Sequence, residues 1–136
     1  MVLHDKIIRL DYNPATDILE TSMPDVTHFM LSEVKMCLDV IVTNIRNYDI
    51  KKLLLDASNS VIEMDEDDEA YKAVAMKFGM DLLGTRLKKI ARVESADARR
   101  EAKSEEARQQ ANLPMEFRNF SSRDEAMSWL LEMRVA

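Results

Sequence analysis

Glycine is scarce in this sequence, with only two residues in 136, Gly79 and Gly84. Loops that wrap a nucleotide phosphate need glycines at fixed spacing, so a GxGxxG dinucleotide loop cannot be built here. The segment GMDLLGTR imitates part of a phosphate-binding loop, but it lacks the lysine, and its first glycine falls inside a predicted helix. The sequence therefore excludes both of these nucleotide-binding loops.

Cysteine and long apolar runs are equally rare. The single cysteine, Cys37, can form no internal disulfide, which fits a reducing compartment. No apolar run approaches the length that spans a bilayer, and the segment 1–6 carries no signal-peptide core. We therefore expect a cytoplasmic protein without stable membrane insertion.

Basic charge and aromatic residues are also in short supply. The chain has 19 Lys and Arg against 25 Asp and Glu, a net charge of -6, and its aromatic share is 6%. Nucleic acids and anionic membranes bind basic surfaces, and unpaired bases stack on aromatic side chains. The charge-dense segment 99–108 mixes both signs, which is typical of a solvated helix face. We expect no nucleic-acid partner.

Residues that could catalyse a reaction or hold a metal do not occur at the spacing that either chemistry needs. His4 and His28 are far apart, and neither has a cysteine or a second histidine at metal-ligand spacing. The acidic run 65–69 lacks the glycine and the alternating oxygen ligands of a calcium loop, so it predicts the first turn of a helix. No nucleophile can be paired with a base. We predict a protein that is not an enzyme, with no metal and no cofactor.

The most informative stretch is 51–60, KKLLLDASNS. Three successive leucines, Leu53 to Leu55, predict a central strand with both faces covered. The polar residues that follow predict a turn at the carboxyl end of this strand. In open α/β sheets ligands usually bind at that edge, so the turn is the first place to look for function.

The chain length fits a single domain, residues 1–136, and the hydrophobic pattern predicts an α/β fold with a mixed sheet. An antiparallel hairpin comes first, and strands then alternate with helices, which implies parallel strands joined by right-handed crossovers. The expected strands are 6–12, 17–23, 51–55, 87–94 and 115–120. About four helices are expected, over 32–48, 65–84, 95–112 and 122–133.

The last of these helices has the best-specified start. Ser122 and Glu125 match a capping box, in which each side chain bonds a backbone amide of the first turn. Ala126, Trp129 and Leu130 follow as its buried stripe.

Four segments together resemble the SpoIIAA-like, or STAS-like, family of small bacterial domains. They are IIRLDYNPATDILETSMPD, KKLLLDAS, EAYKAVAMKFGMDLLGTRLKKIARV and MEFRNFSSRDEAMSWLLE. The ending is the most specific, because an aromatic strand and a capped helix usually close that family's domain. The resemblance covers nearly the whole chain and implies a SpoIIAA-like β/α superhelix. It links the chain to anti-sigma-factor antagonists and to lipid-carrying domains of the SEC14 type.

The sequence departs from the antagonists at their phosphorylation site. In those relatives a phosphorylatable serine follows the central strand within Asp-Ser-Ser-Gly or Asp-Ser-Thr-Gly, whereas here the equivalent region reads DASNSVIEMDEDDE, without glycine. Ser58 and Ser60 are the nearby serines, and the surrounding carboxylates would repel a phosphate. Serine and asparagine are ordinary turn residues. We therefore expect a structural turn rather than a phosphorylation switch.

Two functional hypotheses follow. The first is a non-enzymatic regulatory or protein-interaction module that binds an unknown protein partner through the turn and the neighbouring helix. The candidate turn residues are Asp56, Ser58, Asn59 and Ser60.

The alternative hypothesis is a binder or carrier of a lipid or another apolar small molecule. Its basis is the ten methionines and a group of large apolar side chains, which could line a pocket mouth, form a homodimer contact or simply cover the core. The group consists of Phe29, Met30, Leu31, Tyr71 and Phe78.

Overall fold

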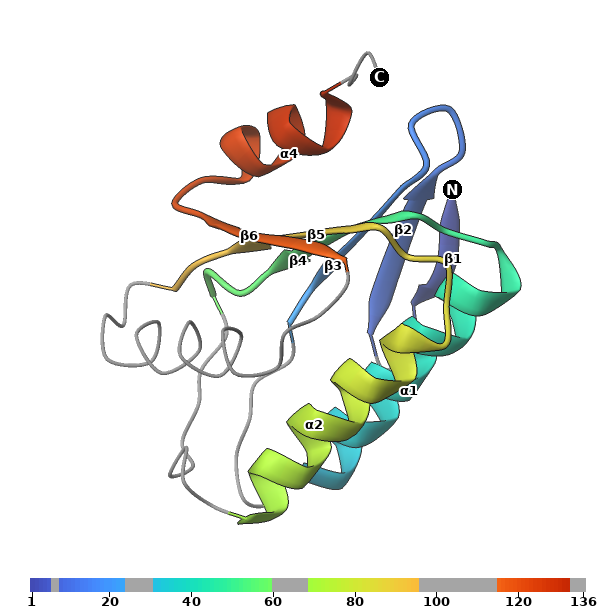
Figure 1. Cartoon of the computed structure of the whole chain (residues 1–136), viewed down its shortest axis with the longest axis vertical. Helices are drawn as coiled ribbons and strands as arrows, with labels where there is room; N and C mark the ends of the chain where they lie inside the picture. The colour runs from blue at the N-terminus through green and yellow to red at the C-terminus, as the bar shows by residue number, and fades with distance from the viewer. Residues whose placement is uncertain (6–7, 24–30, 60–68, 96–114, 133–136) are drawn as a thin grey trace.

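The computed structural model of the protein describes residues 1–5, 8–23, 31–59, 69–95 and 115–132. Within these ranges the chain forms six strands and three helices (Figure 1). The strands are β1 (Val2–Asp5), β2 (Arg9–Asn13), β3 (Ile18–Ser22), β4 (Lys52–Asp56), β5 (Lys89–Val93) and β6 (Glu116–Phe120). The helices are α1 (Leu31–Asn47), α2 (Glu69–Leu83) and α4 (Arg123–Leu131).

All six strands belong to one mixed sheet in the order β1-β2-β3-β4-β5-β6. The first three strands are antiparallel, and β3 to β6 are parallel neighbours. The predicted hairpin and the predicted parallel strands are thus confirmed. The sequence analysis did not predict β1, because its four residues show no run of apolar or β-branched side chains.

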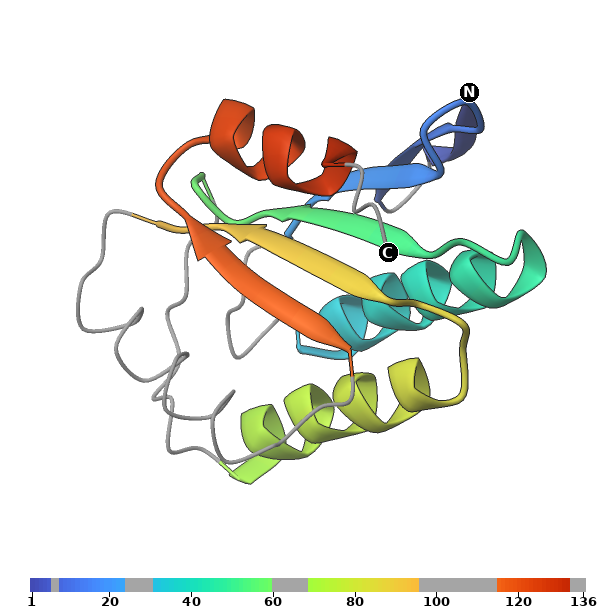
Figure 2. The same cartoon turned by 45° about the horizontal axis from the view of Figure 1, so that its top comes forward.

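Helices cover both faces of the sheet. Helices α1 and α2 lie side by side on one face, and α4 lies on the other (Figures 1 and 2). Leu53 and Leu55 of β4 join the core beneath α1 and α2, whereas Leu54 joins the core beneath α4. All three are buried. The two covered faces predicted from successive leucines are confirmed.

The prediction of about four helices is not borne out. The described ranges contain three helices, and of the fourth predicted helix, 95–112, only Ser95 is described, in a non-helical conformation. The rest of that predicted helix, 96–112, lies outside the described residues.

Helix α4 begins at the predicted N-cap, Ser122, and the serine half of the predicted capping box is confirmed. The Ser122 hydroxyl oxygen accepts a hydrogen bond from the backbone N–H of Glu125 at 3.2 Å. The Glu125 carboxylate accepts a bond from the hydroxyl of Ser121 at 3.4 Å. Trp129 is buried, with its ring centroid 5.6 Å from that of Phe120 and 4.8 Å from the ammonium of Lys89. These contacts fix α4 over β5 and β6.

Candidate functional site

The predicted turn lies at the carboxyl end of β4. The Asp56 carboxylate accepts hydrogen bonds from the backbone N–H of Ser58 at 3.0 Å and from the Ser58 hydroxyl at 2.6 Å. Ala57 is buried, and its N–H donates to the carbonyl of Val93 at 3.0 Å. Ser58 and Asn59 are exposed, and Ser60 lies outside the described residues. The Asp56 carboxylate therefore holds the turn together.

The predicted apolar group is described only in part. Leu31, Tyr71 and Phe78 are half-buried and pack against the core beneath α1 and α2. Phe29 and Met30 lie outside the described residues. The structure thus brings Leu31, Tyr71 and Phe78 to the same core cluster, which is the simplest of the three roles considered for them.

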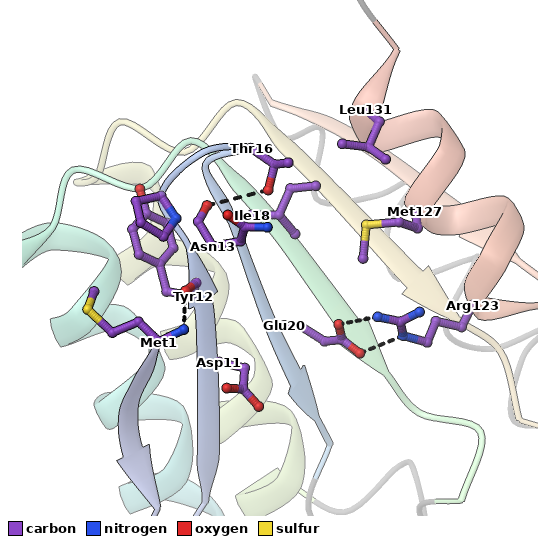
Figure 3. Close-up of a pocket in the computed structure, with 11 residues that line it drawn as sticks. Met1, Asp11, Tyr12, Asn13, Thr16, Ile18, Glu20, Arg123, Met127 and Leu131 are labelled. Carbon is purple, nitrogen blue, oxygen red and sulfur yellow. Dashed lines mark hydrogen bonds and ion pairs between the residues drawn. The ribbon is translucent and has the colours of Figure 1, made fainter.

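A groove lies on the opposite face of the sheet, between α4 and the β2–β3 hairpin (Figure 3). It encloses about 560 Å³, with the buried Ile18 in its floor and Met127 and Leu131 on its α4 side. A second hollow of about 390 Å³ adjoins it and shares Asp11, Glu20 and Arg123. This groove was not predicted from the sequence, because it forms beside β2 and β3, and α4 packs mainly on β4, β5 and β6 instead.

An ion pair joins the two sides of the groove. The Arg123 guanidinium donates two hydrogen bonds of 2.6 Å to the two carboxylate oxygens of Glu20, which raises the pKa of Arg123 (Figure 3). On the neighbouring strand Arg9 pairs with Asp11 at 2.8 Å. Ion-paired side chains can face water, which explains how β2 and β3 tolerate a face that no described helix covers.

The outward side of α2 has the opposite character. Met76, Met80 and Leu83 keep 67%, 64% and 48% of their surface exposed. At 100° per residue these positions share one side of the helix, away from Phe78 and the buried Leu82. We call Ala73, Met76, Gly79, Met80 and Leu83 the α2 outer face. The exposed Lys72 and Glu69, one and two turns before Met76, lie on this same side. Helix α2 is therefore apolar on the side facing the sheet, and it carries a second apolar series, with these two charged residues at its N-terminal end, on the side facing water.

Charge along the inner flank of α2 is neutralised within the chain. The Lys77 ammonium lies 2.6 Å from a carboxylate oxygen of Asp81 and 3.2 Å from one of Asp39 on α1. These contacts raise the pKa of Lys77, with the Asp81 hydrogen bond contributing most. Because Lys77 is held towards α1, it does not cover the methionines.

The sequence analysis counted the methionines but did not locate them on a surface. Of the large apolar residues of α2, it named Tyr71 and Phe78 as candidates for an apolar contact and gave no role to Met76 or Met80. A second apolar series at positions 73, 76, 80 and 83 also has helical spacing, and it is the signal that would have predicted the α2 outer face.

Other candidate chemistry is sparse in the described part of the chain. No group of three or more His, Cys, Asp or Glu side chains within it could hold a metal ion. Cys37 is buried on α1, and burial raises the pKa of its thiol, with a smaller contribution from Glu33. Among the described helices, none is both long and apolar enough to cross a bilayer.

Comparison with known proteins identifies the fold. No protein-family model and no curated protein matches the chain. A solved structure of an uncharacterised protein of the DUF3478 family from Shewanella loihica PV-4, which has a SpoIIAA-like fold, matches with a TM-score of 0.57 and 18% identity. The match covers 90% of this chain and 91% of the other. The chain therefore has a SpoIIAA-like fold, which confirms the resemblance drawn from the sequence at the level of the fold.

Proposed function

We propose that this protein is a non-enzymatic interaction module that binds protein partners through the α2 outer face. The observation that carries the proposal is the exposure of Met76, Met80 and Leu83 on a single side of one helix. Single exposed apolar residues are ordinary, but contiguous ones on a helix mark contact surfaces in soluble proteins.

The chemistry of the surface favours a protein as the partner. Methionine is enriched at the centre of protein interfaces, and its flexible thioether adapts to differently shaped partners. Burying apolar surface is favourable by about 25 cal/mol per Å², so a partner that covers two methionines and a leucine gains several kcal/mol. A regulatory role fits such a module, because it changes the activity of a partner without chemistry of its own.

Quantitative affinity capture from the source cells tests this proposal. The tagged full chain is compared with the double variant Met76→Glu/Met80→Glu, and all captured proteins are quantified by mass spectrometry. A differently tagged second copy of this chain is expressed in the same cells, so that self-association is also counted. The control is Leu131→Glu, which places the same charge at a residue of α4 that is 45% exposed on the opposite face.

The proposal predicts that at least one protein is retained by the wild type and by Leu131→Glu but lost from the double variant. Circular dichroism and thermal unfolding establish that both variants are folded. If the three baits capture the same proteins in the same amounts, the α2 outer face is not a contact surface and the proposal is wrong.

A further inference from the structure

We propose that the partner bound by the α2 outer face is a second copy of this chain, whose α2 packs antiparallel against the first at Gly79. This inference rests on the proposed function and names the partner. It starts from an observation separate from the exposed methionines.

That observation is the space around Gly79. Glycine is a poor helix former, yet Gly79 lies in the eleventh position of a 15-residue helix. A Cβ atom added there would meet nothing within 4 Å, so packing within the chain does not require glycine at this position. A residue without a side chain beside an apolar stripe allows another helix to approach closely.

The outer face is complementary to itself in an antiparallel arrangement. With a two-fold axis halfway between Met76 and Met80, each Met76 lies at the level of Met80 of the second copy. The small Ala73 lies at the level of the larger Leu83. In a two-fold dimer every contact between two different residues occurs twice, so one short apolar stripe on each copy provides a complete interface.

Charge supports the same arrangement. Glu69, in the first turn of α2, would lie beyond the end of the second copy's α2. Arg86, three residues past that end, contacts Asp49 of its own chain at 3.5 Å, and its side chain is 78% exposed. Glu69 therefore approaches a partly paired arginine at each end of the pair, which adds a modest attraction. Lys77 lies near the two-fold axis, so it would approach Lys77 of the second copy. Because Asp39 and Asp81 already neutralise its charge, this approach brings little net repulsion.

The size of the contact sets the expected strength. A pair of 15-residue helices lies at the small end of specific interfaces, below about 1,200 Å² of total buried surface. Such interfaces bind weakly, so the dissociation constant should be on the order of 10 µM.

Sedimentation equilibrium of the purified full chain, up to about 200 µM, tests the inference. The wild type should form dimers, and Gly79→Gln should raise the dissociation constant at least about tenfold, because the new side chain fills the space needed by the second helix. Leu131→Glu should leave the constant within about twofold. A monomeric wild type, or a dimer unaffected by Gly79→Gln, would overturn the inference.

Cysteine cross-linking tests the register. An equimolar mixture of Met76→Cys and Met80→Cys chains should form disulfide-linked dimers at least about fivefold faster than either variant alone. In the proposed register position 76 faces position 80 of the second copy, whereas the two copies of position 76 are offset by about 6 Å along the helix axis. The native Cys37 is buried and competes little. If Met76→Cys alone or Met80→Cys alone formed disulfide-linked dimers faster than the mixture, the two helices would be parallel and the inference would be overturned.

The two proposals can fail separately. If the wild type is monomeric but the Met76→Glu/Met80→Glu variant loses a different protein in cells, the α2 outer face remains a contact surface and the homodimer is wrong. If no captured protein, including the tagged second copy, depends on Met76 and Met80, both proposals are wrong.

Discussion

Tyr12 and Asp17 hold the turn of the β2–β3 hairpin. The Tyr12 hydroxyl donates a hydrogen bond of 2.7 Å to the Asp17 carboxylate, and the backbone N–H of Asp17 donates to the carbonyl of Asn13 at 2.8 Å. Asp17 has φ 58°, a left-handed conformation that aspartate tolerates in turns. Burial raises the pKa of Tyr12 to about 12, and the hydrogen bond and charge of Asp17 add to the effect.

Replacing Tyr12→Phe removes this hydrogen bond and should lower the free energy of unfolding by about 1–2 kcal/mol at neutral pH. The folded-state pKa of Tyr12 exceeds its ordinary value of 10. The contribution of Tyr12 to the free energy of unfolding is therefore fully present below pH 10 and is lost as the pH rises through about 12. Urea denaturation at several pH values measures this, with Tyr48→Phe, at an exposed tyrosine, as the control. Equal effects of the two substitutions would contradict the role given to Tyr12.

Gly79 gives a second prediction for a single residue. Gly79→Ala should raise the free energy of unfolding of the monomer by up to about 1 kcal/mol, because alanine favours helix and the added Cβ meets no atom of the chain. Denaturation at low protein concentration measures the monomer alone. The comparison is Gly84→Ala, just after the end of α2, where the gain should be smaller. A destabilising Gly79→Ala would show that the surroundings of Gly79 are more crowded than described.

At the scale of elements, α4 is tied to the hairpin by one ion pair. The side chains of Arg123 and Glu20 are partly exposed, so solvent screens their attraction despite the two short hydrogen bonds. A double-mutant cycle of Glu20→Gln and Arg123→Gln should give a coupling energy of about 0.5–1 kcal/mol, decreasing in about 1 M salt. Coupling near zero at low salt would mean that apolar packing alone positions α4.

The elements that the sequence predicted best are those with strong local signals. The three leucines of β4 and the capped start of α4 were predicted correctly, because burial on both faces and capping leave distinct patterns. Strand β1 was missed, since it depends on pairing with β2 rather than on its own residues. The helix predicted over 95–112 lies, apart from Ser95, outside the described residues.

The candidate site was harder to predict than the fold. The turn at Asp56 was placed correctly at the end of β4, but its carboxylate bonds to Ser58 within the turn. The groove beside Arg123 depends on how far α4 covers the sheet, which no local pattern encodes. The exposure of Met76 and Met80 depends on which side of α2 faces the sheet, and both sides are apolar in the sequence.

Across the whole molecule, polar and apolar surfaces are distributed in an unusual way. Beside α4, the face of β2 and β3 that no described helix covers carries charges paired at Arg9 and Arg123. The outer side of the helix layer, where charge would be expected, exposes the apolar side chains of Met76 and Met80. This distribution is the reason we propose a contact surface on α2 rather than on the sheet.

Methionine oxidation footprinting tests this account most directly. Met76, Met80 and Met1 are 67%, 64% and 64% exposed, so peroxide should oxidise all three at similar rates in the dilute, isolated protein. Met1 lines the groove on the other face and serves as the internal reference. In intact source cells, oxidation of Met76 and Met80 relative to Met1 should fall by roughly threefold or more, because a partner covers α2. The same ratios in cells and in dilute solution would contradict the account.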